Sequence, residues 1–239
     1  MTLLDLTLPT PEENLALDEA LLEAAEAGEA PDDCLRLWEP PEPLVVVGRS
    51  SQVAREVHAA ACHERGIPNL RRASGGSAIV TGPGCLMYAL VLSFHARPAL
   101  RSIDAAHTFV LQALAQAIGA RVPGVRCRGT SDLVVGERKF SGNSLRVKRE
   151  HLLYHGTLLY DFPLPLVEIC LAQPPRQPAY RAGRSHGEFV ANLPISGVEL
   201  RRLVAGVWSA RLPPAAWPAA LTRELVRTKY SRREWNDRY

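Results

Sequence analysis

Three features are missing from this chain of 239 residues, and each absence narrows its class. No apolar run approaches the ~20 residues that cross a membrane. The first ten residues carry no Lys or Arg ahead of an apolar run, so no secretory signal is visible. The five cysteines stand apart, without the CxxC or Cys/His spacing of a zinc site. We therefore expect a cytoplasmic protein without membrane partners, whose cysteines are mostly small buried residues.

A strong net charge is also missing. The formal net charge is +3, too weak to indicate nucleic-acid binding. Basic residues gather only near the C-terminus, at Arg223, Arg227, Lys229, Arg232 and Arg233. We interpret them as a solvated helix end, with attraction of an acidic partner as the alternative. A hydrophobic fraction of 46% suits a globular protein, and we expect residues 1–239 to form a single domain with no accessory C-terminal domain.

Helical and extended patterns are mixed along the chain. Thr10, Pro11 and Glu13 give the capping box and proline of a helix start, and Gly28 suits the end of that helix. Periodicity predicts helices over Asn14–Ala27, Val53–Gly66, Ile103–Ile118, Gly197–Ala210 and Ala219–Lys229. Alternation and β-branched runs predict strands over Cys34–Trp38, Leu44–Val47, Leu70–Arg72, Ala78–Thr81, Cys85–Phe94, Asp132–Val135, Lys139–Phe140, Leu145–Lys148 and Leu152–Leu159. Hairpins with helices between them predict an α+β fold with a mixed, mostly antiparallel sheet flanked by helices.

The first segment that can carry chemistry is Arg71-Arg72-Ala73-Ser74-Gly75-Gly76-Ser77. Adjacent glycines let the backbone pass close to a ligand, and their N–H groups can then face an anion. The arginines can add charge-assisted hydrogen bonds to the same anion. An ordinary tight turn with solvated arginines explains this segment equally well when it is taken alone.

The second segment runs from Asp132 to Gly142 and contains Gly136-Glu137-Arg138 as a hairpin turn. Lys139 then lies on a strand just after the turn, with Ser141 and Gly142 continuing its face. A lysine fixed on a strand can neutralise a reacting carboxylate or phosphate. A surface lysine in a hairpin is the alternative interpretation. The third segment is His155-Gly156-Thr157, a histidine beside a glycine on a strand.

Together these segments resemble the lipoate–protein ligase family, whose members carry the motifs RRxSGGG, DLVVxGRKxSG and HGTLL. This chain has RRASGGS, DLVVGERKFSG and HGTLL in the same order, and 229–236 (KYSRREWN) resembles the family's C-terminal signature. The resemblance covers nearly the whole chain. It implies the α+β fold of biotin–protein ligases and class II aminoacyl-tRNA synthetases. It also implies that lipoate and ATP form lipoyl-adenylate, and that the acyl group then passes to a lysine of an apo lipoyl carrier domain or a glycine-cleavage H-type protein.

The resemblance also assigns roles to residues. Lys139 would be catalytic and contact the activated carboxyl and phosphate. Arg49, Asp132 and Lys139 would bind ATP, with Mg²⁺ held through Asp132. The substrate, lipoate or octanoate, would contact Arg71, Ser74, Gly75, Gly76, Ser77, Ser141, Gly142, His155, Gly156 and Thr157.

Departures from the pattern leave alternatives open. Ser77 replaces the third glycine, and Thr81-Gly82 stand where the family often has a His-Asp pair. Many ligases carry an accessory C-terminal domain, so a separate accessory subunit is one possibility. A second is an octanoyl- or lipoyltransferase that needs no ATP and uses Cys170 as a thioester nucleophile, although we favour Cys170 as a packing residue. A third is a relative that has lost catalysis and acts as a partner subunit.

Overall fold

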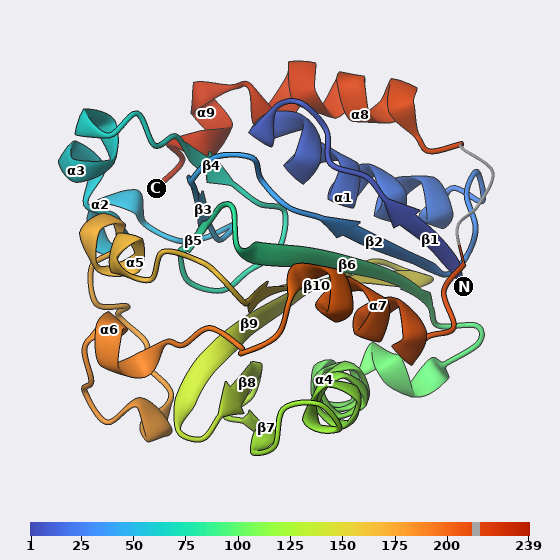
Figure 1. The fold of residues 1–239 in the computed structure, drawn as a ribbon. Helices are drawn as coiled ribbons and strands as arrows, with labels where there is room; N and C mark the ends of the chain where they lie inside the picture. The colour runs from blue at the N-terminus through green and yellow to red at the C-terminus, as the bar shows by residue number, and fades with distance from the viewer. Residues whose placement is uncertain (212–215) are drawn as a thin grey trace.

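The computed structural model describes residues 1–211 and 216–239, and its main feature is a long twisted sheet (Figure 1). In the described residues this sheet has seven strands in the order β1-β2-β6-β10-β9-β8-β7. Its first two strands are parallel and the others pair antiparallel. The strands are β1 (Thr2–Asp5), β2 (Cys34–Trp38), β6 (Cys85–Ser93), β7 (Val125–Arg128), β8 (Asp132–Val135), β9 (Arg138–Val147) and β10 (His151–Leu159). The mixed, mostly antiparallel sheet confirms the predicted fold class.

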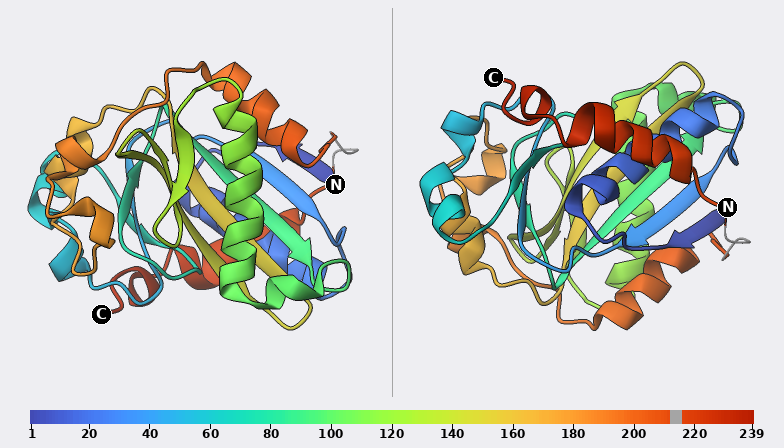
Figure 2. Two further views of the ribbon diagram at one scale, coloured as in Figure 1. Left: turned by 90° about the horizontal axis from the view of Figure 1, so that it is seen from below. Right: turned by 90° about the horizontal axis from the view of Figure 1, so that it is seen from above.

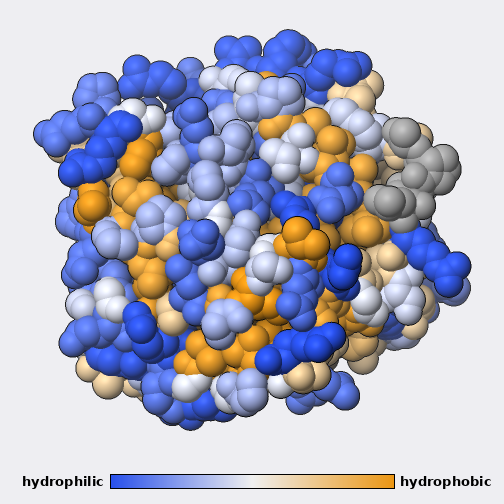
Figure 3. All heavy atoms as spheres, viewed as in Figure 1, coloured by the Kyte–Doolittle hydropathy of each residue, from blue (hydrophilic) through white to orange (hydrophobic). Residues whose placement is uncertain are grey.

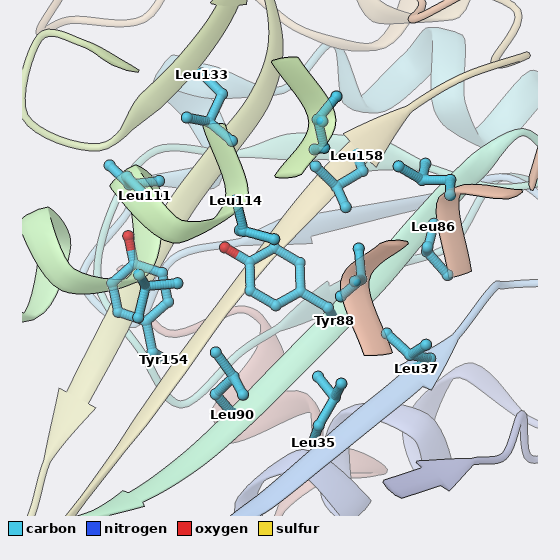
Figure 4. Close-up of a cluster of buried hydrophobic side chains, with 14 of the residues drawn as sticks. Leu35, Leu37, Leu86, Tyr88, Leu90, Leu111, Leu114, Leu133, Tyr154 and Leu158 are labelled. Atoms are coloured by element: carbon cyan, nitrogen blue, oxygen red, sulfur yellow. The ribbon is translucent and has the colours of Figure 1, made fainter. Parts of the chain in front are cut away.

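Helices cover both faces of this sheet, as the two views of Figure 2 show. One face carries α1 (Pro11–Glu26) and α8 (Ala219–Leu225), and the other carries α4 (Ile103–Gly119) and α7 (Gly197–Val207). The predicted start of α1 is confirmed, because Thr10 and Glu13 form a complete capping box. Each face buries its own apolar layer. In Figure 4, Tyr88 and Tyr154 on neighbouring strands point with Leu90 toward Leu111 and Leu114 of α4.

A smaller three-stranded sheet packs at the end of the long one. It consists of β3 (Leu44–Val47) between β4 (Asn69–Arg71) and β5 (Ile79–Thr81), with β3 and β4 parallel. Short helices surround it, namely α2 (Val53–Glu56), α3 (Ala59–Glu64), α5 (Pro165–Cys170), α6 (His186–Phe189) and α9 (Arg233–Asn236). The segment between β4 and β5 is the glycine-rich motif, so this motif lies where the two sheets meet.

Two short single-turn helices complete the described elements, η1 (Pro98–Arg101) and η2 (Ala179–Arg181). Within residues 1–211 and 216–239, no helix combines the length and apolar character needed to cross a membrane. On the face shown in Figure 3, hydrophobic residues lie in several groups separated by polar ones.

Two predicted boundaries were wrong. The helix expected over Val53–Gly66 is split, because Val57 is extended and bridges to Leu171 while His58 N–H donates to the carbonyl of Cys170. The strands expected at Lys139–Phe140 and Leu145–Lys148 are one continuous strand, β9. Pairing with both β8 and β10 supplies hydrogen bonds along its length, which local patterns do not reveal.

The basic C-terminal group is solvated as predicted, except for Lys229. Helix α8 continues into a π-helix, η3 (Val226–Tyr230), which turns Lys229 inward. The ammonium of Lys229 lies 2.7 Å from Glu19 Oε2, and Tyr230 Oη donates to the same oxygen at 2.7 Å. Arg146 of β9 contacts the other oxygen of Glu19 at 2.7 Å. Lys229 therefore joins the C-terminal segment to α1 and is not part of the solvated face.

The most deeply buried ion pair joins α1 to the sheet. Arg36 of β2 is fully buried, and its Nη1 lies 2.6 Å from Asp18 Oδ1. The same guanidinium also donates to the carbonyls of Leu6 and Asn14 and to the Asn14 side chain. A buried charge with all its donors occupied fixes the position of α1 on β2.

We predict that Arg36→Met lowers the free energy of unfolding by about 3–5 kcal/mol, because Asp18 would keep a buried, unpaired charge. Urea unfolding followed by circular dichroism measures this loss. The control is Arg101→Met. Arg101 and its partner Glu150 are both about half exposed, so the expected loss of unfolding free energy is about 0–1 kcal/mol. Equal losses in the two variants would show that the buried pair has no special structural role.

Candidate active site

A cavity of about 400 Å³ opens where the two sheets meet. It gathers side chains from α1, β3, β6, β9 and β10, from the glycine-rich segment and from the loop after α5. Among its lining residues are eight that the sequence predicted, namely Gly76, Ser77, Asp132, Lys139, Gly142, His155, Gly156 and Thr157. The tertiary structure therefore brings all three sequence segments to one place.

A second cavity of about 160 Å³ adjoins the first. The two share several lining residues, including Ser77, Lys139, Gly142 and Thr157. The walls of the smaller cavity are mainly apolar, and they include Val80, Leu159, Val167, Leu171 and Phe189. Ser141, another predicted site residue, lines only this smaller cavity. Both cavities are mainly apolar, the charged Lys139 borders both, and the larger one adds Asp132 and Arg72. Charged groups beside apolar walls suit a ligand with an anionic end and a hydrocarbon part.

Lys139 reaches the cavity because β9 carries a bulge. Ser141 pairs with Leu133 but Lys139 pairs with Val134, so Phe140 is one residue too many for the ladder. Bulges re-aim side chains, and here the Lys139 ammonium lies 2.7 Å from Asp132 Oδ1. Tyr180 Oη donates to the other oxygen of Asp132 at 2.8 Å. Burial and the neighbouring Asp132 carboxylate raise the pKa of Tyr180, so its hydroxyl stays protonated and donates.

In the glycine-rich segment, neighbouring residues occupy the backbone carbonyls and leave the N–H groups free. Every carbonyl from Ser74 to Ser77 accepts a hydrogen bond: Ser74 from Arg49 N–H, Gly75 from Arg72 and Ser144, Gly76 from Ser51, and Ser77 from Arg72. The N–H groups of these four residues donate to no other group within the described residues. Gly76 adopts a φ of 88°, a left-handed conformation that favours glycine. Free N–H groups beside a cavity form a binding place for an anion.

Of the two adjacent arginines, Arg72 and not Arg71 lines the larger cavity, which Arg176 lines as well. The Nη2 of Arg72 donates to the carbonyl of Gly75 at 2.5 Å and to that of Ser77 at 3.0 Å, and Nε donates to Ser74 Oγ at 3.1 Å. Burial lowers the pKa of Arg72 to about 10, which leaves the guanidinium charged at neutral pH. Arg72 thus holds the glycine-rich segment in place through its carbonyls and the Ser74 hydroxyl.

The prediction that Arg71 contacts the ligand was wrong. Its fully buried side chain points away from both cavities and donates to the carbonyls of Gly48, Ser51, Trp235 and Asn236. Trp235 Nε1 and the Asn236 side chain in turn bond to the Arg71 backbone. Each of the three guanidinium nitrogens of Arg71 donates to a backbone carbonyl, and the side chain lies outside both cavities. Arg71 joins the C-terminal segment to the small sheet.

Three further predicted residues lie beside the cavities without lining them. The Arg49 side chain is exposed, and only its backbone contacts the glycine-rich segment. Ser74 is buried, and its hydroxyl lies 2.5 Å from His155 Nε2. Gly75 presents its carbonyl to Arg72 and Ser144. Ser74 and Gly75 contact residues that line the larger cavity, and none of the three lines a cavity itself.

Sequence reasoning missed several polar residues that line the larger cavity. Asp18 and Asn143 are two of them, and Thr130, Ser131, Ser144, Arg176 and Gln177 are others. Asn143 accepts from Tyr88 Oη at 2.5 Å and donates to the carbonyl of Ser131 at 2.8 Å. It fits only because Gly156 lies opposite on β10, where a Cβ atom would come within 1.9 Å of the Asn143 Oδ1. The requirement for glycine in the HGT motif is therefore steric. Asn143 directly follows Ser141-Gly142, and a polar residue at that place was the available signal.

The cysteines give no sign of a nucleophile. Cys170 is fully buried at the end of α5, and burial raises the pKa of its thiol to about 12. Burial also raises the pKa of Cys85 to about 12. Neither thiol, nor any other in the described parts of the chain, lines the two cavities. The preferred interpretation of Cys170 as a packing residue agrees with this environment.

Metal-binding groups are sparse in the site. The described residues contain no cluster of three or more His, Cys, Asp or Glu side chains arranged to hold a metal ion. A metal held through Asp132 would therefore depend on this carboxylate and on ligands from the substrates.

Comparison with protein families matches residues 10–198 to the lipoyl protein ligase A/B catalytic domain. A protein of Aeropyrum pernix described as a lipoate–protein ligase A is 32% identical over 63% of this chain and 54% of its own length. The lipoate–protein ligase LplJ of Bacillus subtilis is 28% identical over 63% of this chain and 43% of its own length. The chain thus spans about half the length of these relatives. The octanoyltransferase LipM of Brevibacillus brevis is 25% identical over 95% of both chains.

Solved structures share the fold. A bipartite lipoate–protein ligase of Thermoplasma acidophilum, studied with its E2 lipoyl domain, has a TM-score of 0.84 at 24% identity, covering 99% of this chain and 95% of its own. A lipoate–protein ligase A bound with ATP has a TM-score of 0.78 at 24% identity, covering 99% and 98%. At these identities the similarity establishes the fold and not the reaction.

We predict that Cys170 resists alkylation in the folded protein. A thiol whose pKa lies near 12 is almost wholly protonated at pH 8, and the thiolate is the reactive form. Iodoacetamide treatment followed by peptide mass spectrometry should label exposed Cys127 and spare Cys170 until the protein is unfolded. A Cys127→Ser variant serves as the control and should be labelled only after unfolding. Rapid native labelling of Cys170 would contradict its role as a packing residue.

Proposed function

The chain belongs to the lipoyl protein ligase A/B catalytic-domain family, and we propose that it activates lipoate with ATP and transfers the lipoyl group to a lysine of a carrier domain. The observation that carries this proposal is the joined pair of cavities. One compartment presents the Lys139 ammonium and the free N–H groups of the glycine-rich segment. The other has apolar walls. Lipoate combines a carboxylate with an apolar tail, and this chemistry matches both compartments.

The residues divide the work of two steps. In the first, a carboxylate oxygen of lipoate attacks the α-phosphorus of ATP and pyrophosphate leaves. In the second, the amine of a carrier lysine attacks the acyl carbon and AMP leaves. Lys139 lies on a strand and is oriented by Asp132, so its positive charge stands ready for the charge that develops on the phosphate and carboxyl oxygens. The N–H groups of Gly76 and Ser77, the two residues of this segment that line the cavity, bind the anionic end and orient it.

Mg²⁺ fits this arrangement through Asp132. Mg²⁺ usually takes one or two carboxylates from the protein and completes its coordination with phosphate oxygens and water. Asp132 is a carboxylate of the cavity wall and lies beside Lys139. The ion would neutralise phosphate charge there.

An octanoyltransferase reaction through Cys170 is the alternative. The similarity to LipM favours it, but it requires an accessible, ionisable thiol. Cys170 is buried, has a raised pKa and lines neither cavity. The Lys139–Asp132 pair also argues against a role as a non-catalytic partner subunit, because such a subunit has no need of a charged pair in its cavity.

The carrier in this proposal is an apo lipoyl domain or an H-type protein. The names of relatives support it: one solved neighbour was studied with its E2 lipoyl domain, and a 32% identical relative from Kyrpidia tusciae is named as an octanoyl-[GcvH]:protein transferase. The neighbour is a bipartite ligase, so a separate accessory subunit is part of the proposal to be tested.

We predict that Lys139→Ala lowers the rate of carrier acylation about 10²–10³-fold, because one preorganised charge at the reacting centre is lost. Mass spectrometry of an apo lipoyl domain incubated with lipoate, Mg-ATP and enzyme measures the rate. Lys148→Ala is the matched control, since Lys148 lies on the same hairpin but pairs with Glu23 away from the cavity. A Lys139→Ala rate equal to that of wild type would refute the catalytic role.

A second arm replaces lipoate and ATP with octanoyl acyl carrier protein. We expect acylation in the ATP-dependent arm, retained in Cys170→Ser. Acylation in the second arm alone, lost in Cys170→Ser, would establish the transferase. Acylation in neither arm would indicate either that the chain needs a partner subunit, which a pull-down from the source cells would then identify, or that it is a relative that has lost catalysis.

A further inference from the structure

Four buried side chains form a continuous chain of contacts along one wall of the larger cavity, and all of them except Ser74 line it. Asp18 Oδ2 lies 3.5 Å from His155 Nδ1, His155 Nε2 lies 2.5 Å from Ser74 Oγ, and Arg72 Nε donates to the same Ser74 oxygen at 3.1 Å. The residues come from α1, β10 and the glycine-rich segment. We call this chain, Asp18–His155–Ser74–Arg72, the histidine relay.

The direction of each hydrogen bond follows from the donors available. Arg72 has only donors, so Ser74 Oγ accepts from it and directs its own proton to His155 Nε2. The relay assigns Nε2 as the acceptor of this proton and Nδ1 as the ring N–H that faces Asp18. The other oxygen of Asp18 is held by buried Arg36 at 2.6 Å. The ion pair in the core therefore holds the carboxylate that faces His155 Nδ1.

The arrangement resembles that of an activated serine, but Ser74 is 1% exposed and lines neither cavity. A nucleophile must reach its substrate, so Ser74 is not one. Its hydroxyl instead fixes Arg72, whose guanidinium holds the carbonyls of Gly75 and Ser77. Those two bonds turn the carbonyls away from the ligand and keep the N–H groups available.

We propose that His155 and Asp18 are positioning residues that act through Ser74 and Arg72 to hold the glycine-rich segment in its anion-binding conformation. The identity of the anion, the lipoate carboxylate or its adenylate, rests on the proposed function. The relay links the structural core to the binding loop, so the loop's conformation is set from behind and does not depend on the ligand.

Three variants separate the two halves of the relay. His155→Asn keeps a donor near the Nδ1 position, toward Asp18, but cannot reach Ser74. His155→Gln places its amide near the Nε2 position and retains an acceptor for Ser74. Ser74→Ala removes the link from the other side. We expect Ser74→Ala and His155→Asn each to weaken lipoate binding by about tenfold to a hundredfold, because the loop is misplaced, whereas His155→Gln retains most of the affinity.

The double variant Ser74→Ala/His155→Asn tests whether the residues act as one unit. If they do, its loss of affinity equals that of either single variant. Isothermal titration with lipoate measures the dissociation constants, and thermal unfolding checks that each variant is folded. Additive losses, or His155→Asn binding as tightly as wild type, would overturn the relay.

Nuclear magnetic resonance of the ligand-free protein tests the relay apart from any activity. The ring ¹⁵N shifts of His155 should show a neutral imidazole with its proton on Nδ1. The amide signals of Gly75 and Gly76 should move in Ser74→Ala and His155→Asn, and much less in His155→Gln. An Nε2-protonated ring, or unmoved glycine amides, would refute the relay even in an active enzyme. Correct tautomer and shifts without lipoate binding would instead count against the proposed function.

Discussion

The structure depends on one buried carboxylate, that of Asp18. One of its oxygens holds Arg36 and so docks α1 on the sheet, and the other faces His155 on β10. A charge buried this deeply must be paired, or its desolvation would cost more than the fold can supply. The requirement to satisfy Asp18 therefore fixes a helix, two strands and, through His155, the segment that borders the cavity. Stability and site geometry have a common origin here.

The site itself is a meeting of two sheets. The long sheet contributes Lys139 and Gly156 from neighbouring strands, and the small sheet contributes the glycine-rich segment between β4 and β5. Within the small sheet, the glycine-rich segment packs directly on the backbone that follows β3. A Cβ atom at Gly48 would lie 1.8 Å from the carbonyl oxygen of Gly76. The bulge at Phe140 adds the last adjustment by turning Lys139 toward Asp132.

The basic C-terminal segment is only partly a solvated surface, because several of its residues bind the rest of the fold. Lys229 and Tyr230 bind Glu19 on α1, while Trp235 and Asn236 hold Arg71 directly before the cavity residue Arg72. The segment thus braces both the helix and the strand that lead to the site. Its exposed arginines remain available to solvent or to a partner, and its inward residues belong to the fold.

The sequence by itself determined the local elements and the family. Capping residues at Thr10, the hairpin around Gly136 and the three motifs are local signals, and they predicted the fold class and eight residues that line the larger cavity. It did not determine which of two adjacent arginines faces the ligand, nor that Lys229 is drawn inward, nor that Asp18 stands behind His155. These outcomes depend on partners 137 to 210 positions away along the chain, namely His155 for Asp18, Trp235 for Arg71 and Lys229 for Glu19. Only the tertiary structure brings such partners together, because the burial of a charged group is decided by what the fold places opposite it and not by its neighbours in sequence.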